Sequence, residues 1–162
     1  MAISREKKKE IIAKISDVLK GSQSVVFVNF HGLSVSDSTA MRRKLRDEGA
    51  GFLVAKKTLV GKALDKTSVT GERPVLEGEL GLAYSHDPIV SARAVYEFQK
   101  KFENRVAIMG GIFEGGYQNK VAMNEIAAIP SMSVLRGMFV NIINSPIQRL
   151  VIALDQIAQQ KT

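Results

Sequence analysis

The sequence predicts an α/β fold in which a single mixed β-sheet is flanked by helices and followed by a protruding C-terminal helical segment. Over residues 1–130, short runs rich in β-branched and aromatic residues alternate with segments of helical apolar period. From residue 131 onward the period is helical throughout and no strand-like run appears. The 162 residues are 45% hydrophobic and 24% charged, which is typical of a globular protein rather than a disordered one.

Capping residues, glycine stops and apolar periodicity delimit the elements of the first half. Ile11, Ile15 and Leu19 recur at helical spacing, whereas the run SVVFVNF is typical of a buried strand. We therefore expect, in order, a helix from a Ser4 cap to Gly21, a strand at 24–30, a helix from a Ser34 or Ser36 cap to Gly49, a strand at 51–55 and a short helix at 56–64.

The second half of the predicted α/β domain follows the same alternation. Residues 65–78 have turn composition without periodicity, which predicts a loop. Asp87 before Pro88 has the form of a helix cap followed by proline at the first helical position. We expect a strand at 79–85, a helix from the Asp87 cap to about Lys101, a strand at 105–113 and a short helix at 119–129. The pattern does not distinguish parallel from antiparallel pairing.

A domain boundary is expected near Pro130, where the alternation of strands and helices ends. It divides an α/β domain at 1–130 from a helical segment at 131–162. Pro146 interrupts the second part, because proline removes an internal hydrogen bond or begins a new helix. The segment is therefore one kinked helix or two helices, the second capped by Ser145.

The composition excludes several classes of protein and gives no support to an active site. The chain has no cysteine, so it offers neither a disulfide nor a thiolate metal site, and this fits a reducing cytoplasm. The N-terminus lacks the apolar stretch of a secretory signal, and no run approaches the 18 apolar residues of a membrane span. His31 and His86 stand alone in turn-like sequence. We therefore expect no catalytic residue, no cofactor, no metal and no membrane partner.

The positive charge is concentrated at the start of the chain. Residues 1–67 carry 14 Lys/Arg and 7 Asp/Glu, a net charge of +7 that equals the net charge of the whole chain. Such a localised basic surface favours a polyanion, with nucleic acid ahead of membrane, although the same charge could serve solubility alone. Lysines in the first turn of a helix oppose the helix dipole, and a bound polyanion would relieve this. The candidates for nucleic-acid contact are Arg5, Lys7, Lys8, Lys9, Arg42, Arg43, Arg46, Lys56, Lys57 and Lys62.

Aromatic residues do not interleave with these cations. The basic region has only Phe27, Phe30 and Phe52, all at strand positions. Stacking on single strands is therefore poorly supported, and contact with the backbone of structured RNA or DNA fits better.

The last predicted helix carries an apolar stripe that nothing after it can cover. The stripe could complete the protein's own core or could bind a partner. A helix lying on a membrane surface is the weakest option, because the segment lacks the cationic face of such helices. The stripe consists of Ile147, Leu150, Val151, Leu154, Ile157 and Ala158.

Three motifs follow one another along the chain: HGLSVSDSTAMRRKLRDEGA, FLVAKKTLVGKAL and an Ala-Ile-Pro hinge before an apolar C-terminal helix. Through these motifs the full length of the chain resembles the family of bacterial large-subunit ribosomal protein ten, the base of the ribosomal stalk. Two positions depart from the family pattern: Lys57 stands where Asn is usual and Met41 where Leu is usual. The second is a tolerable core exchange, whereas the first removes an amide contact and leaves a phosphate contact open.

The resemblance implies a non-catalytic component of the large ribosomal subunit in the cytoplasm. Its N-terminal domain would bind large-subunit rRNA at the GTPase-associated centre, beside ribosomal protein eleven, through the basic candidates named above. Its C-terminal stripe would carry dimers of the acidic stalk protein (ribosomal proteins seven and twelve), about two by analogy, which recruit translational GTPases. The resemblance also implies repression of the protein's own mRNA. The rival interpretation is a free-standing nucleic-acid-binding regulator whose C-terminal helices belong to its own core.

Overall fold

The computed structural model describes residues 5–67, 69–71, 73–76, 78–102 and 105–160, and the expected Ser4 cap lies outside these ranges. The chain divides into two compact units, Met1–Ile129 and Pro130–Thr162, which are described separately.

The first unit contains one five-stranded sheet in the order β2-β3-β1-β4-β5. Its strands are β1 (Ser24–Phe30), β2 (Gly51–Val54), β3 (Leu80–Ser85), β4 (Val106–Phe113) and β5 (Gly116–Asn119). All four strand pairs are antiparallel, so the α/β class and the single sheet are confirmed but the expected mixed pairing is wrong. The fifth strand was not predicted, because the short polar run GYQN has no apolar period. Glu114 (φ 49°) and Gly115 (φ 81°) form the tight turn between β4 and β5.

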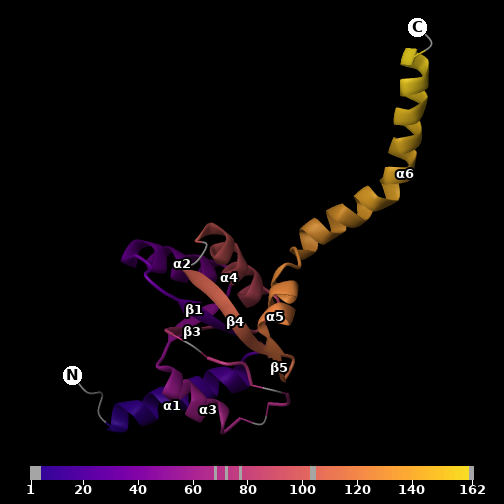
Figure 1. Cartoon of the computed structure of the whole chain (residues 1–162). Coiled ribbons are helices and arrows are strands. Elements are labelled where there is room, and N and C mark those ends of the chain that lie inside the picture. Colours follow the sequence, from indigo (N-terminus) through magenta and orange to yellow (C-terminus); the bar gives the residue numbers. More distant parts are fainter. Residues whose placement is uncertain (1–4, 68, 72, 77, 103–104, 161–162) are drawn as a thin grey trace. The chain divides into compact units, whose positions relative to one another are not determined.

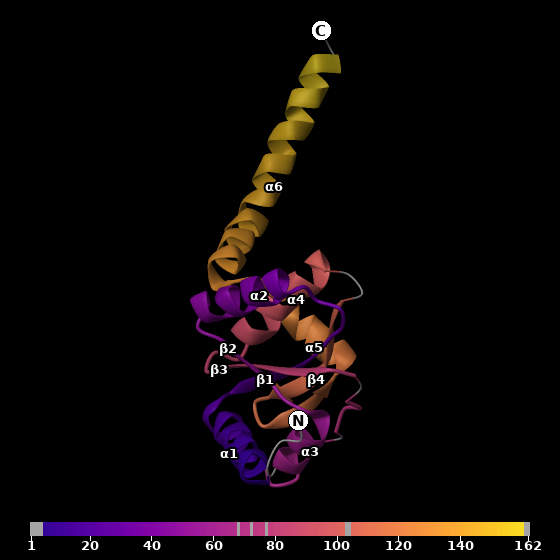
Figure 2. The same ribbon diagram turned by 90° about the vertical axis from the view of Figure 1, so that its left-hand side faces the viewer.

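Helices cover both faces of the sheet and enclose two separate cores. Helices α2 (Val35–Asp47), α4 (Val90–Lys101) and α5 (Lys120–Ala127) lie on one face, and α1 (Arg5–Gly21) and α3 (Lys57–Leu64) lie on the other, as Figure 2 shows. Alternate side chains of β1 point to opposite faces, so Val26 and Val28 join the first core and Val25 and Phe27 the second. Burial on both sides explains why the sequence of β1 is a nearly continuous apolar run although its sheet is antiparallel.

A bulge in β4 changes which of its side chains face each core. Phe27 pairs with Gly110 and Val28 with Ile108, which leaves Met109 as the extra residue. Ile108 therefore faces the α2–α4–α5 core and Ile112 the α1–α3 core. Gly110 has φ 143°, and a Cβ there would lie 2.7 Å from the carbonyl oxygen of Gln118. Only glycine fits this position without strain.

The helix caps agree with the sequence at α2 and differ at α4. Ser34 caps α2, since its Oγ accepts a hydrogen bond from the Asp37 amide at 3.1 Å. Asp87 accepts from the Ile89 amide at 3.0 Å, but α4 begins only at Val90. Asp87 thus caps a turn before the helix, and the expected start at Pro88 is wrong by two residues.

The second unit is a single helix, α6 (Met132–Gln160), with Pro146 inside it. Of the two alternatives, one continuous helix is therefore confirmed. Pro146 has no N–H to donate to the carbonyl of Ile142, one turn earlier. The ribbon of α6 changes direction where its colour passes from orange to yellow in Figure 1, which fits a proline kink.

By length and composition alone, the 28 residues Met132–Gln159 could cross a membrane, since an 18-residue window within them has a mean hydropathy of 1.3. Polar residues such as Asn141, Asn144 and Arg149 interrupt its apolar run, which is why counting uninterrupted apolar residues predicted no span. An arginine near the centre of a spanning helix costs roughly 2.5–3.5 kcal/mol. A membrane role for α6 therefore has little physical support.

Candidate nucleic-acid interface and C-terminal apolar face

The predicted cations of α1 and α3 lie in one layer of the first unit. Helices α1 and α3 pack against each other and share the core under the same sheet face. Lys7, Lys8 and Lys9 are exposed in the N-terminal part of α1, which begins at Arg5. Lys56 precedes α3 as its N-cap, Lys57 is its first residue and Lys62 lies in its last turn, all exposed. We call the outer surface of these two helices the α1–α3 face.

The predicted arginines of α2 lie on the opposite side of the sheet. Arg42, Arg43 and Arg46 are exposed on a helix that packs on the other core. The structure therefore divides the sequence-predicted set between two layers. Arg42 alone reaches the edge of the sheet, where its guanidinium lies 5.9 Å from the ring centroid of Phe52 in edge strand β2.

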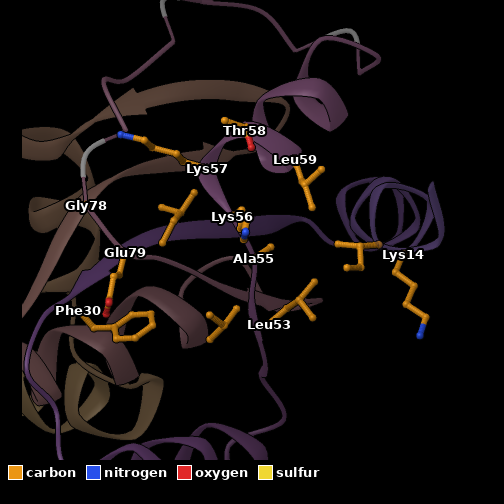
Figure 3. A pocket seen from close by; sticks show the side chains of 13 residues that line it. Lys14, Phe30, Leu53, Ala55, Lys56, Lys57, Thr58, Leu59, Gly78 and Glu79 are labelled. Atoms are coloured by element: carbon orange, nitrogen blue, oxygen red, sulfur yellow. The ribbon is translucent and has the colours of Figure 1, made fainter. Parts of the chain in front are cut away.

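Between α1, β2 and α3 the structure has a hollow of about 790 Å³, which we call the α1–α3 hollow (Figure 3). Its apolar lining comes from Ile11, Phe30, Leu53, Val54, Ala55, Leu59 and Leu80. Its charged lining comes from Lys14, Lys56, Lys57 and Glu79. Lys56 and Lys57 were predicted from the sequence, whereas Lys14 and Glu79 were missed because each stands outside the basic clusters.

A second, smaller hollow of about 350 Å³ adjoins the first through Lys57 and also contains Arg73. Arg73 pairs with Asp65 at 3.1 Å and lies against α3, so that a Cβ on Gly61 would be 2.8 Å from its Nη2. Burial raises the pKa of the nearby Tyr117 phenol, while Arg73 opposes this rise, so Tyr117 adds no charge at neutral pH. Arg73 was missed because it falls in the predicted loop 65–78.

Lys44 of α2 forms ion pairs within the first unit. Lys44 forms ion pairs with Glu97 of α4 and with Glu48, and its ammonium lies 5.6 Å from the ring centroid of Phe98. Arg93 of α4 approaches Glu48 at 3.8 Å. These contacts join α2 to α4, whereas Arg43 and Arg46 are exposed on α2.

The large apolar side chains of α6 are exposed, from 36% at Leu135 to 69% at Ile142. The predicted stripe shares this exposure: Ile147, Leu150, Val151, Leu154, Ile157 and Ala158 are all exposed. Ile152 is 55% exposed and does not belong to the stripe, so the apolar surface of α6 is wider than predicted. Both cores of the first unit are built from residues up to Ala127.

In the part of the chain that the structure describes, no group of three His, Asp or Glu side chains could hold a metal ion. His31 and His86 are exposed, and they follow opposite ends of the antiparallel pair β1–β3. Together the fold and its surfaces define a small basic α/β protein with two candidate binding surfaces, the cationic α1–α3 face and the exposed apolar side chains of α6.

The comparisons with known proteins identify the family. The family model described as Ribosomal protein L10 matches residues 3–100. A large ribosomal subunit protein uL10 of Bacillus licheniformis is 30% identical over 162 residues, covering 99% of this chain and 97% of that protein. Proteins of the same name from Erythrobacter litoralis (34% identity, 91% and 86% covered) and Oceanobacillus iheyensis (28%, 96% and 94%) are also similar. This chain belongs to the ribosomal protein L10 family, whose members are structural ribosomal proteins rather than enzymes.

Proposed function

We propose that this protein is a cytoplasmic component of the large ribosomal subunit that binds rRNA with its first unit and anchors stalk-protein dimers on α6. The observation that carries the proposal is the contrast between the two units: a cationic α1–α3 face on one, and an apolar, exposed helix on the other. The rRNA site would be the GTPase-associated centre, beside ribosomal protein eleven. Recruitment of translational GTPases through the dimers, and repression of the protein's own mRNA, belong to the same proposal.

The α1–α3 face has the charge needed for RNA backbone contact. Lys8 and Lys9 of α1, together with Lys56, Lys57 and Lys62 of α3, could neutralise about five phosphates. Log K should then fall with log salt concentration at a slope of about −4, by the coefficient for duplexes. The slope is measured by fluorescence anisotropy, with a labelled fragment of large-subunit rRNA that contains the GTPase-associated region. A flat salt dependence would contradict phosphate binding.

The apolar stripe of α6 has enough surface for stable protein association. Burial of its six side chains would contribute on the order of 9–18 kcal/mol gross, at about 1.5–3 kcal/mol each. Association itself costs about 4–15 kcal/mol, so the surplus supports a tight complex. Left in water, the same surface would favour aggregation.

Co-expression with the acidic stalk protein tests the anchoring role. Native mass spectrometry of the full chain should show bound stalk dimers, whereas a chain that lacks residues 145–162 should lose at least part of them. The truncated chain should still bind the rRNA fragment, because the α1–α3 face is unchanged. If the full chain stays free of stalk protein, the anchoring proposal fails.

The rival interpretation, a free regulator with the C-terminal helix in its own core, predicts a different result. Removal of residues 145–162 would then unfold the first unit and abolish RNA binding. The membership of the ribosomal protein L10 family and the exposed side chains of α6 both favour the anchoring role.

A further inference from the structure

We propose that the α1–α3 hollow holds one nucleobase of the bound RNA, extruded from its stack, with the flanking phosphates held by Lys14, Lys56 and Lys57. This inference rests on the proposed RNA binding of the α1–α3 face. It adds a contact that distinguishes one nucleotide from its neighbours, which lysine–phosphate contacts cannot do.

The interior of the hollow suits a base better than it suits a phosphate. Its wall is mainly apolar, with Ile11, Leu53 and Leu80 on it, and its volume of about 790 Å³ falls within the roughly 300–1,000 Å³ of small-ligand sites. A phosphate placed among these side chains would lose hydration without compensation. A base has an apolar face, which suits the apolar wall, and a polar edge. The three lysines of the lining could contact the phosphates of the RNA backbone on either side of the base.

Phe30 supplies an aromatic surface in this hollow. It is the last residue of β1, half-buried, and packs edge-on against Phe52 with ring centroids 6.3 Å apart. Figure 3 shows its ring near Glu79 at one end of the hollow, with Lys14 at the opposite end. Unstacked bases in RNA complexes commonly stack on aromatic side chains. Although the sequence indicated only a strand position for Phe30, the structure places it where a base could stack.

Among the residues that the structure describes, Glu79 is the one acidic side chain in the lining of the hollow. Its backbone carbonyl accepts a hydrogen bond from the Phe30 amide at 3.3 Å, which holds the two residues side by side. Near phosphates alone, its carboxylate would weaken RNA binding through like-charge repulsion. As an acceptor for the N–H donors on the Watson–Crick edge of a base it would strengthen binding, and guanine presents two adjacent donors to one carboxylate.

The sign of the effect of Glu79→Gln therefore tests the inference. With a base in the hollow, the substitution should weaken binding of the GTPase-associated rRNA fragment by roughly 10-fold, because a charge-assisted hydrogen bond is lost. With phosphate contacts only, it should strengthen binding, and this result would overturn the inference. Glu125→Gln, at an exposed position of α5 outside the hollow, makes the same charge change and serves as the matched control.

A second variant removes the stacking surface without changing charge. Phe30→Leu should weaken binding by roughly 5- to 150-fold, the range for loss of one base–aromatic stack, while the salt slope stays unchanged because every lysine remains. Phe30→Tyr, which keeps the ring, should bind like the unsubstituted protein. Phe102→Leu, at a half-buried aromatic position outside the hollow, controls for general loosening. Equal weakening by Phe102→Leu and Phe30→Leu would overturn the inference.

A series of RNA fragments with one abasic nucleotide each identifies the partner of the hollow. At one position, removal of the base should weaken binding to the unsubstituted protein. The same abasic RNA should bind the Phe30→Leu variant no more weakly than the intact RNA does. If no position behaves in this way, the hollow is empty of RNA or takes an apolar side chain of a neighbouring protein, and the inference fails. If the unsubstituted protein shows no salt-dependent affinity for any fragment, the proposed RNA binding itself fails, which is a different result.

Discussion

Lys57 lines both hollows of the α1–α3 face. An ammonium on a flexible stem contacts phosphate as a point charge, whereas an amide can pair with a specific edge. Lysine at this position therefore supplies charge rather than base specificity. A specific contact has to come from other residues that line the α1–α3 hollow, and Phe30 and Glu79 are the two to which we assign it.

Replacement of Lys57 by glutamine should weaken RNA binding about equally for all sequences that the protein binds, and should make the salt slope shallower by about 1. The expected change follows from the loss of one phosphate contact. Lys120→Gln, at an exposed residue of α5 on the other side of the sheet, should leave the slope unchanged. Anisotropy titrations at several salt concentrations measure both. An unchanged salt slope for Lys57→Gln would show that Lys57 does not contact an RNA phosphate.

Gly110→Ala should destabilise the first unit by at least about 1–3 kcal/mol, the usual cost of backbone strain at one residue. The physical reason is its φ of 143° together with the Gln118 carbonyl oxygen 2.7 Å from the added Cβ. Gly21→Ala, at the exposed end of α1 with open space around it, should be neutral or slightly stabilising. Urea unfolding of both variants compares them directly, and equal midpoints would mean that the bulge in β4 relaxes.

At the level of elements, the sequence predicted every helix of the first unit and four of its five strands. The misses have physical causes. β5 is short and polar because it lies at an edge of the sheet and is formed by its turn with β4, so no apolar period marks it. The start of α4 was misplaced because Asp87 and Pro88 suit a turn as well as they suit a helix cap. The hollow was not predictable, since Lys14, Phe30 and Glu79 come from three separate elements.

Pro146→Ala should straighten α6 and strengthen its middle turns. The substitution restores an N–H that can bond the Ile142 carbonyl, and proline is about 3 kcal/mol less favourable than alanine inside a helix. Amide hydrogen exchange of the full chain should slow for residues near the substitution, while exchange in β1 stays the same. If the stalk dimers bind across the bend, native mass spectrometry should also show fewer dimers. Unchanged exchange would mean that the chain tolerates the proline without local weakening.

At the level of the whole molecule, strand direction was the part of the fold that the sequence could not give. Helices on both faces bury β1 on both sides, and a strand buried on both sides has the same apolar run whether its neighbours are parallel or antiparallel. Surface charge was better predicted than its arrangement. The candidate cations from Lys7 to Lys62 are exposed, but α2 carries its arginines on the other side of the sheet from α1 and α3.

Deletion of residues 131–162 should leave the thermal midpoint of the first unit within a few degrees of the full chain. Both cores consist of residues up to Ala127, so the deletion removes none of their members. Differential scanning calorimetry measures the midpoint, and deletion should also reduce aggregation on heating, because the exposed apolar side chains of α6 are gone. A large fall in the midpoint would show that α6 stabilises the first unit.

The position of α6 after both cores has a consequence during synthesis of the chain. Domains fold as units while translation proceeds from the N-terminus, at about 5–20 residues per second. The roughly thirty residues of α6 therefore leave the translating ribosome a few seconds after the strands and helices of the first unit. By then Ile108, Phe27 and their neighbours can already be packed. The apolar side chains of α6 therefore have little opportunity to form non-native contacts with an unfinished core. Its order in the chain thus protects folding in a way that no contact within the finished protein reveals.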